Sequence, residues 1–296
     1  MKKILLISNN SYSLVHFRKE FILFLLNKGF FVDVIIGDDI PDDFINHKNF
    51  HIVSISFNNR SKNPFSLISL ISKISKYIKN SNPDYVFTFQ IKANIAGLIA
   101  ARKSKVINSF AMIEGMGDPF QPKTFFDKIT KLIVCCLYKI SFKKVKKVFF
   151  LNQDDKKEML ANKLISSDKA VSIPGIGIDI NTYKPNCYLP AAKKVIMIAR
   201  LLKNKGIFEY CKIAELVKSK RNDIEFELYG SEFQLKQQDI QFYIDNGIIK
   251  YCGFTNDIKT VINNCRIVLS TSYREGFSRI ILESMALGRT VIASNV

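Results

Sequence analysis

The sequence is poor in the side chains from which metal and disulfide sites are built. Its 296 residues include three histidines and six cysteines, and no pair of cysteines has the C-x-x-C spacing of a zinc or redox motif. This composition excludes a disulfide framework and a zinc module. The adjacent Cys135 and Cys136 instead indicate core positions in a reduced, cytoplasmic protein.

Long apolar runs are also missing, although 47% of the residues are hydrophobic. A membrane-spanning helix needs roughly 18 consecutive apolar residues. The longest candidate, Leu132–Tyr138, is shorter and is bracketed by lysines. The first residues, Met1–Ser8, resemble the start of a signal peptide, but their apolar run is too short, and they favour a buried strand.

Acidic residues are scarce in the first half of the chain. Residues 1–150 carry 23 Lys and Arg against 10 Asp and Glu, a net +13, whereas residues 151–296 carry 21 against 16, a net +5. The segment Lys123–Lys147 holds eight lysines and one acid, with apolar residues near helical spacing. This favours an amphipathic helix on an anionic membrane surface. The alternative is a core helix with a solvated lysine face. No nucleic-acid signature accompanies the lysines, so we expect no nucleic-acid partner.

Short apolar strands alternate with helical patterns along the whole chain, which is long enough for two domains. Such alternation predicts mostly parallel, doubly wound sheets of the α/β class. A Pro/Gly-rich stretch divides the pattern. We therefore predict a first Rossmann-like domain over 1–173, a linker over 174–190 and a second Rossmann-like domain over 191–296.

The predicted elements follow from these periodicities. In the first domain the strands are Ile4–Ser8, Phe31–Ile36, Ile52–Ile55, Tyr85–Phe89, Val106–Phe110, Val148–Leu151 and Ala170–Ile173, and the helices are Leu14–Asn27, Pro64–Lys79, Asn94–Lys103, Phe125–Phe142 and Asp154–Leu164. In the second domain the successive elements are Val195–Ala199, Phe208–Lys218, Glu225–Tyr229, Ile248–Tyr251, Ile258–Asn263, Ile267–Ser270, a helix after Gly276, and Thr290–Ala293.

Two glutamates near the end of the chain, Glu275 and Glu283, stand eight residues apart around a predicted helix start. A helix N-terminus suits a phosphate because its N–H groups and its dipole favour negative charge. A carboxylate two turns further on can accept hydrogen bonds from a pair of ribose hydroxyls. The spacing indicates a nucleotide-sugar site, although a pair of glutamates on a surface helix has the same pattern.

Arg200 and Lys205 follow another predicted strand, Val195–Ala199. Ligands of open α/β sheets bind beyond the carboxyl ends of the strands. Two cations there can hold a diphosphate and stabilise its charge as it leaves. A solvated basic loop is the simpler account of these two residues alone, but both Arg200 and the glutamate pair map to the same edge of one sheet.

Four residues of the first domain are candidates for contact with an acceptor. His16 is predicted in the loop after the first strand and can touch the reacting hydroxyl or a phosphate. Glu114 lies in a Gly-rich turn after a strand, where it can order a sugar or act as a base. Lys92 and Asn94 follow a strand end, and lysine there suits a diphosphate. The alternatives are a surface histidine, a turn glutamate and a helix start capped by Asn94.

Several motifs together resemble the retaining family 4 glycosyltransferases of the GT-B fold. They are Arg200 to Lys205-Gly206, the Glu275-x7-Glu283 pair, and the segment Gly175–Asp179 followed by Tyr183–Pro185. The chain is further similar to bacterial transferases that build capsule, O-antigen or glycoprotein glycans on a polyprenyl-diphosphate carrier. That likeness depends on His16–Arg18, Lys92–Asn94 with Gly97, Glu114–Gly117 and Leu137–Lys143.

The resemblance implies a role for each candidate residue. The donor is a nucleotide-diphospho-sugar, such as a UDP-hexose or UDP-N-acetylhexosamine. Arg200 and Lys205 hold its diphosphate, Glu283 binds its ribose, and Glu275 contacts its sugar. Backbone amides of Gly276, Phe277, Ser278 and Arg279 meet the phosphates. Glu275, His16 and Glu114 form the catalytic group, and Lys92 and Asn94 bind the acceptor.

The resemblance also implies the reaction and its setting. The sugar is transferred with retention of configuration to a polyprenyl-diphosphate-linked saccharide, without metal or cofactor, by a cytoplasmic protein on the inner face of the cell membrane. Family members usually continue past Val296, so we expect the second domain to be incomplete at its C-terminus and activity to suffer. The remaining alternatives are another GT-B enzyme, such as an epimerase or a phosphorylase, and a non-catalytic membrane-docking protein.

Overall fold

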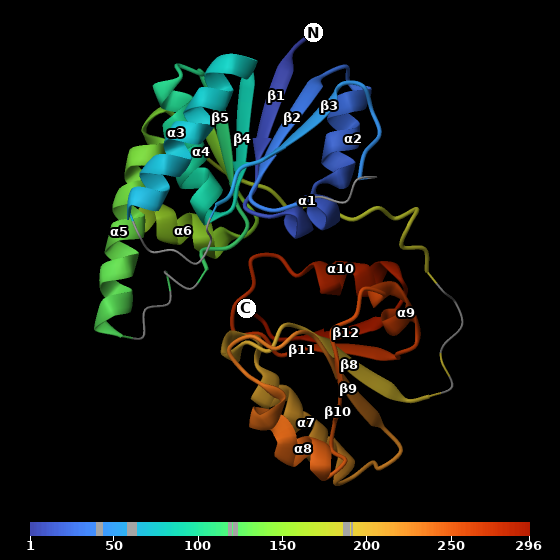
Figure 1. The fold of residues 1–296 in the computed structure, drawn as a ribbon. Helices are drawn as coiled ribbons and strands as arrows, with labels where there is room; N and C mark the ends of the chain where they lie inside the picture. Colours follow the sequence, from blue (N-terminus) through green and yellow to red (C-terminus); the bar gives the residue numbers. More distant parts are fainter. Residues whose placement is uncertain (40–43, 58–63, 118–119, 121–123, 186–189, 191) are drawn as a thin grey trace. The chain divides into compact units, whose positions relative to one another are not determined.

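A computed structural model describes residues 1–39, 44–57, 64–117, 120, 124–185, 190 and 192–296. The chain divides into two compact units, Met1–Ile176 and Gly177–Val296. Each is an open sheet with helices on both faces, and each is described by itself (Figure 1).

The first unit is built on a seven-stranded sheet in which every described pairing is parallel. The strand order is β3-β2-β1-β4-β5-β6-β7, so the order reverses between β1 and β4. The strands are β1 (Lys3–Ile7), β2 (Phe31–Ile36), β3 (Phe50–Ser54), β4 (Tyr85–Phe89), β5 (Asn108–Ile113), β6 (Lys147–Phe150) and β7 (Ala170–Ser172).

The central strand β1 explains why the sheet is covered on both faces. Its residues Ile4 to Ile7 are all buried, and successive side chains point to opposite faces of a strand. Leu5 and Ile7 accordingly join one core, and Ile4 and Leu6 join the other. A continuous apolar run is typical of a parallel strand buried between two helical layers.

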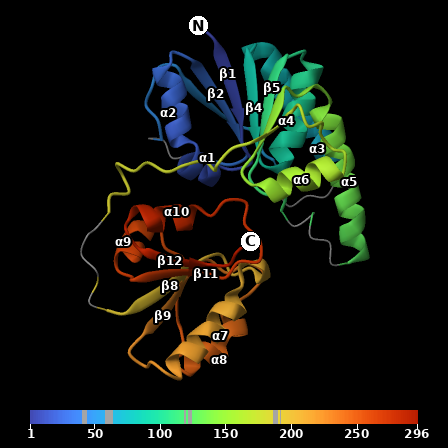
Figure 2. The same ribbon diagram turned by 180° about the vertical axis from the view of Figure 1, so that it is seen from behind.

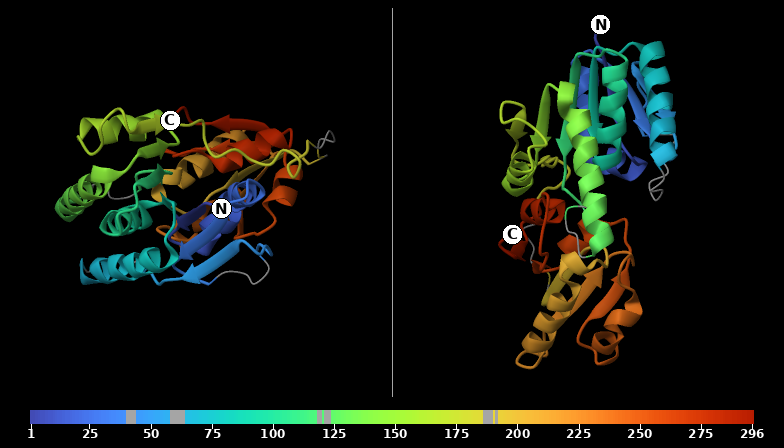
Figure 3. Two further views of the ribbon diagram at one scale, coloured as in Figure 1. Left: turned by 90° about the horizontal axis from the view of Figure 1, so that it is seen from above. Right: turned by 90° about the vertical axis from the view of Figure 1, so that its left-hand side faces the viewer.

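The helices of this unit supply those layers. They are α1 (Ser11–Phe17), α2 (Lys19–Asn27), α3 (Pro64–Ser81), α4 (Ile91–Lys103), α5 (Phe125–Ser141) and α6 (Gln153–Ala161). Helices α3, α4 and α5 lie along one side of the sheet and α2 lies on the other, as Figures 1 and 2 show from opposite directions. Figure 3 gives the same layers from above and from the side.

One predicted helix, Leu14–Asn27, is divided in the structure. Arg18 ends α1 and caps α2, with φ −126° and ψ −8°, outside the helical range. The prediction of a single helix was wrong because the apolar spacing of Leu14, Ile22 and Leu25 continues across the break. The break turns the Arg18 side chain into the protein, where it is 3% exposed.

The second unit repeats the plan on five parallel strands in the order β10-β9-β8-β11-β12. The strands are β8 (Lys194–Ile198), β9 (Glu225–Tyr229), β10 (Lys250–Gly253), β11 (Ile267–Ser270) and β12 (Thr290–Ala293). The helices are α7 (Ile207–Lys218), α8 (Gln241–Asp245), α9 (Ile258–Asn263) and α10 (Arg279–Ala286). Helices α7 and α8 cover one face, and α9 and α10 cover the other (Figures 1 and 2).

Most predicted elements are found with shifted ends, and three differences bear on the site. Helix α10 begins at Arg279 instead of directly after Gly276, so Glu275 lies in a loop. Helix α4 begins at Ile91, so Asn94 lies inside the helix and does not cap it. The second unit already includes Gly177, inside the predicted linker 174–190; residues 186–189 of that linker lie outside the described residues.

Candidate active site

Two loops of the second unit meet at the carboxyl edge of its sheet. The loop after β8 passes through a short 3-10 turn, Lys203–Lys205, to Gly206, and the loop after β11 begins at Thr271. The Thr271 hydroxyl donates to the Gly206 carbonyl at 2.7 Å, and the Tyr273 amide donates to the Asn204 carbonyl at 2.9 Å. These bonds fix one loop against the other.

Gly206 makes the close approach possible. It has φ +71°, in the left-handed region, and a Cβ there would collide with the carbonyl of Thr271. The loops therefore come together only because this position lacks a side chain. Their contact carries Lys205 and Glu275 to one place.

The Lys205 ammonium donates to Oε1 of Glu275 at 2.5 Å, and the Ser272 hydroxyl donates to the same oxygen at 2.8 Å. Both charged side chains remain partly exposed. Ser272 is buried and belongs to no motif in the sequence, so residue type alone did not single it out. The structure thus holds a cation and a carboxylate together at the edge where ligands of such sheets bind.

Arg200 comes from the same loop, two residues after the end of β8. Its guanidinium lies 5.4 Å from the ring centre of Phe233, and both side chains are largely exposed. Such stacking orients a planar guanidinium and leaves its N–H groups available to phosphate oxygens.

Helix α10 carries Glu283 in its second turn, and this residue is only 3% exposed. Arg279, one turn earlier, donates from Nε to Oε1 of Glu283 at 2.5 Å. The Tyr183 hydroxyl donates to the same oxygen at 2.9 Å. Desolvation raises the pKa of Tyr183, and the neighbouring Glu283 charge raises it further, so the phenol keeps its proton.

Residues Gly276, Phe277 and Ser278 form the loop that leads into α10. Ser278 is the N-cap, with an extended backbone (φ −78°, ψ 104°) and no side-chain cap hydrogen bond. The first N–H groups of a helix have no partner within the helix. The start of α10 is also the positive end of its helix dipole, which suits an anion.

In the first unit, His16 lies within helix α1, in agreement with the predicted helix Leu14–Asn27 and not in the preceding loop to which the site prediction assigned it. Its Nδ1 is 2.9 Å from the Tyr12 carbonyl, and its ring stacks on Tyr12 with centroids 4.1 Å apart. The helical periodicity places Tyr12 one turn before His16, and that contact fixes the imidazole on an exposed surface.

Glu114 follows β5 in a turn with two glycines at positive φ, as predicted. Its carboxylate forms an ion pair with Arg18. The Arg18 guanidinium lies 4.4 Å from the ring centre of Phe89 and donates to the Phe17 carbonyl at 2.9 Å. The sequence contained Arg18 within a motif, but only the structure shows that it holds Glu114.

Lys92 and Asn94 have different surroundings in the first turns of α4. Burial lowers the pKa of Lys92, which is partly exposed. Asn94 is 0% exposed: its amide accepts from the Thr88 hydroxyl at 2.7 Å and donates to the Met112 carbonyl at 2.9 Å. In this structure Asn94 joins α4 to β4 and β5, and a direct contact with an acceptor would require that core to open.

Helix α5 has an exposed apolar stripe, which we define as Phe125, Phe126, Ile129, Leu132, Ile133 and Ile140. Its first two members are 72% and 78% exposed, whereas Tyr138 on the opposite side is buried. A Thr124–Asp127 capping box starts the helix, and Lys123 lies outside the described residues. Among the described helices, none is long and apolar enough to cross a membrane.

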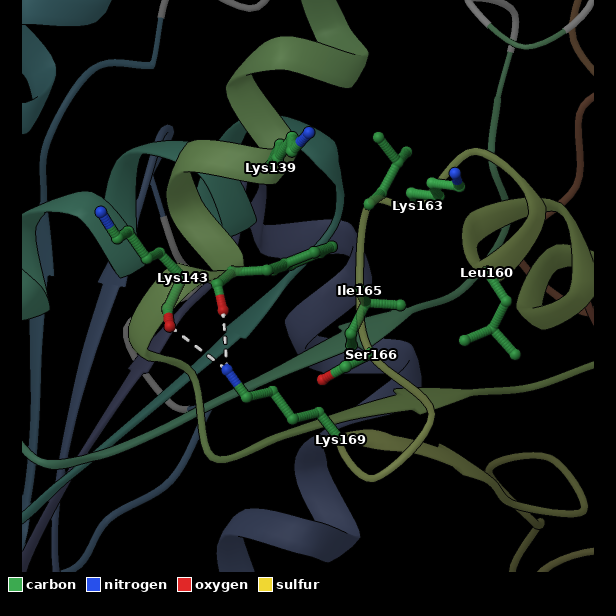
Figure 4. Close-up of a pocket in the computed structure, with 9 residues that line it drawn as sticks. Lys139, Lys143, Leu160, Lys163, Ile165, Ser166 and Lys169 are labelled. Carbon is green, nitrogen blue, oxygen red and sulfur yellow. Dashed lines mark hydrogen bonds between the residues drawn. The ribbon is translucent and has the colours of Figure 1, made fainter.

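A hollow of about 400 Å³ near the C-terminal end of α5 is lined by Lys139, Lys143, Lys163 and Lys169 (Figure 4). Lys169 donates to the carbonyls of Phe142 and Lys143, at 3.5 and 3.2 Å, where the helix ends. The Lys143 side chain points away from these groups (Figure 4). The lysines do not converge on a common point, and Lys169 caps the helix instead.

Comparison with known proteins identifies the class that this fold and this site define. The model of the family described as "Glycosyl transferase 4-like" matches residues 3–152, and that described as "Glycosyl transferases group 1" matches residues 192–296. The chain belongs to the glycosyl transferase 4-like family, and it is a glycosyltransferase.

Individual relatives agree with this assignment. The chain is 28% identical, over 98% of its length and 79% of the relative's, to N,N'-diacetylbacillosaminyl-diphospho-undecaprenol alpha-1,3-N-acetylgalactosaminyltransferase of Campylobacter jejuni. The structure of Anabaena HepE in complex with UDP and glucose matches with a TM-score of 0.74 at 17% identity, over 100% of this chain and 81% of that one. A glycosyltransferase from Rickettsia africae matches with a TM-score of 0.75 at 21% identity, over 100% and 80%. These matches confirm the predicted GT-B fold.

Proposed function

We propose that the protein transfers a sugar from a nucleotide-diphospho-sugar to a lipid-linked saccharide, with retention of configuration, in the assembly of a surface glycan. The observation that carries this proposal is the Lys205–Glu275 pair at the carboxyl edge of the second sheet, next to helix α10 with its buried Glu283. A nucleotide-diphospho-sugar needs a cation and a helix start for its phosphates, and carboxylates for its sugar and its ribose hydroxyls.

Each part has a task in the proposed reaction. Arg200 and Lys205 neutralise the diphosphate as the bond to the sugar breaks, and amides at the start of α10 share that charge. Glu275 contacts the donor sugar, and Glu283 accepts from the ribose hydroxyls. No metal or cofactor takes part in this proposal.

The acceptor is proposed to be a saccharide on a polyprenyl diphosphate, because the Campylobacter jejuni relative is named for a substrate on undecaprenyl diphosphate. His16, Lys92 and Glu114 come after β1, β4 and β5, which are neighbours in the first sheet. All three residues therefore follow the carboxyl ends of these strands, which suits an acceptor site. Since Arg18 already pairs with Glu114, we assign Glu114 to ordering the acceptor sugar rather than to accepting its proton.

A lipid-linked acceptor requires the enzyme to work at a membrane surface. The exposed apolar stripe of α5, with Lys128 and Lys139 beside it in the sequence, has the composition of a helix that lies in the interface. We propose that α5 docks the protein on anionic lipid, at the cytoplasmic face of the membrane.

The test is a transfer assay on the whole chain. Acceptor on undecaprenyl diphosphate is presented in anionic vesicles with a panel of nucleoside diphosphate sugars, with and without EDTA, after thermal-shift screening of the same panel. We expect one donor to raise the melting temperature and to be consumed only when acceptor is present, with EDTA having no effect. Donor conversion without acceptor would instead indicate an epimerase, and vesicle binding without nucleotide binding would indicate a docking protein.

A further inference from the structure

Tyr183 connects the segment that opens the second unit to the buried carboxylate of α10. Its hydroxyl lies 2.9 Å from Oε1 of Glu283, a residue 100 positions later. Arg279 approaches the same oxygen at 2.5 Å. Because Glu283 is nearly fully buried, these two donors determine how its carboxylate is turned.

The backbone before Tyr183 is itself held in place. The Thr182 hydroxyl and the Tyr183 amide both donate to Asp179, at 2.5 and 3.0 Å. Lys259 of α9 donates to the Thr182 carbonyl at 2.8 Å. The Tyr183 ring packs against the apolar cluster of Ile262 and Leu287. These contacts fix the backbone and the ring of Tyr183, and so they also fix the position of its hydroxyl beside Glu283.

The two contacts occupy only half of the carboxylate. An ionised carboxylate has two oxygens with about four acceptor positions in total. Tyr183 and Arg279 both bind Oε1, and among the described residues no hydrogen bond reaches Oε2. A vicinal diol offers two hydroxyl donors, which is the chemistry that the remaining oxygen accepts.

We propose that Tyr183 is a positioning residue for the nucleotide: by holding Oε1 of Glu283, it presents Oε2 to the 2′- and 3′-hydroxyls of the ribose. This inference rests on the proposed nucleotide-sugar donor and adds a specificity determinant from outside the sheet edge. A tyrosine that served packing alone would need only its ring.

The experiment compares Tyr183→Phe with the parent, using uridine diphosphate and its 2′,3′-dideoxy analogue in calorimetry. The variant keeps the ring and removes the hydroxyl. We expect uridine diphosphate to bind about tenfold more weakly, which corresponds to about 1.4 kcal/mol, and the dideoxy analogue to bind within about twofold of the parent. Glu283→Gln should abolish this difference, so that adding Tyr183→Phe to it has no further effect on the ratio.

Tyr229→Phe is the matched control, because the Tyr229 hydroxyl donates to another glutamate of the same unit, Glu227, at 2.7 Å. It should lower stability without changing the ratio of the two ligands. Arg279→Gln removes the other donor on Oε1 and provides a second variant if Tyr183→Phe folds poorly. Equal losses for both ligands in Tyr183→Phe and in Arg279→Gln, or no loss, would overturn the inference alone. A parent that binds no nucleoside diphosphate would overturn the proposed function and the inference with it.

Discussion

The ammonium nitrogen of Lys205 lies 2.5 Å from Oε1 of Glu275, although 70 residues separate them in the sequence. The pair neutralises itself in the absence of ligand. A diphosphate therefore has to compete with Glu275 for the lysine. The Arg200 guanidinium is stacked on the Phe233 ring, and a ring does not compete with phosphate for its N–H groups. Replacing either cation should weaken the binding of a nucleoside diphosphate.

We predict that Arg200→Ala and Lys205→Ala each weaken nucleoside diphosphate binding by about 1.5–3 kcal/mol, the range for hydrogen bonds to charged groups. Lys203→Ala is the control, since Lys203 is an exposed lysine of the same short turn. Calorimetry would show a large loss for the first two variants and little for the third. Unchanged affinity in both Arg200→Ala and Lys205→Ala rules out the assignment.

Glu275→Gln separates binding from transfer. The substitution removes the charge that competes for Lys205, so uridine diphosphate should bind as tightly as before or more tightly. Transfer should nevertheless fall at least about tenfold, or roughly 1.4 kcal/mol of barrier, because Glu275 acts on the donor sugar in our proposal. A variant with both weaker binding of uridine diphosphate and normal turnover contradicts this role.

Gly206→Ala tests the contact between the two loops. The new Cβ meets the Thr271 carbonyl, so we expect a loss of about 1–3 kcal/mol in unfolding free energy, together with weaker nucleotide binding. Gly247→Ala is closely matched, since Gly247 also has positive φ (+62°) but has no atom within 4 Å of a built Cβ. Denaturant titration of both separates the collision from the backbone strain that they share. Equal losses of unfolding free energy in the two variants would show that the loops move apart around the new Cβ with no loss of stability beyond the shared backbone strain.

The exposed stripe of α5 predicts membrane binding that depends on apolar side chains as well as on charge. Replacing both Phe125 and Phe126 by serine should reduce co-sedimentation with anionic vesicles and leave the melting temperature unchanged, because both side chains are exposed. Phe242→Ser, at a residue of the second unit that is 62% exposed, should leave sedimentation unaffected. Added salt should weaken parent binding as lysine–lipid attraction is screened. If the double variant sediments as the parent does, α5 is not the docking element.

We predict that the partly buried charge of Lys92 lowers the stability of the fold while it serves binding of the acceptor. Burial lowers its pKa from the ordinary 10.5, so the unfolded chain binds that proton more tightly. The loss of folding stability caused by burying the charged lysine is complete below the lowered pKa, and it disappears as the pH rises toward 10.5. Lys92→Met should therefore raise the melting temperature at pH 7, with a smaller gain near pH 10, and should weaken use of a diphosphate-linked acceptor.

Lys103→Met is the control for this variant, because it adds the same side chain at the exposed end of the same helix. A thermal scan at the two pH values would show no such gain for it. If Lys92→Met is no more stable than the parent at pH 7, the burial of Lys92 carries no cost.

The sequence predicted the two alternating sheets well because buried parallel strands are short apolar runs between helical periods. Phe31–Ile36, Glu225–Tyr229 and Thr290–Ala293 have the predicted ends. The break at Arg18 was missed because the spacing of apolar residues gives no information on where a charged side chain turns into the protein. The short helix α8 was missed because Gln241–Asp245 has no buried residue to create a period.

The site was predictable in its residue types and less so in its contacts. Arg200, Lys205, Glu275 and Glu283 were identified from strand ends and spacing. The structure brings Lys205 and Glu275 into contact, with Arg200 in the same loop as Lys205 and Glu283 in the second turn of α10. Their partners Ser272 and Tyr183 were not assigned, because a hydroxyl becomes a donor to a particular carboxylate only through tertiary packing. The acceptor role of Asn94 came from the family resemblance, whereas its helical pattern predicted a helix start; the structure places Asn94 inside α4.

The strand order of the first unit has a consequence for the growing chain on the ribosome. β1 emerges first, but its second neighbour is β4, and Ile4 pairs with Tyr85. Until the chain has grown past Phe89, β1 has one open edge, and the core that contains Leu5 and Ile7 lacks the residues that α4 contributes to it. Sheets assembled from such distant partners fold slowly and expose apolar edges meanwhile. We therefore expect nascent chains that stop before β4 to be bound by chaperones, and those that include α4 to be released.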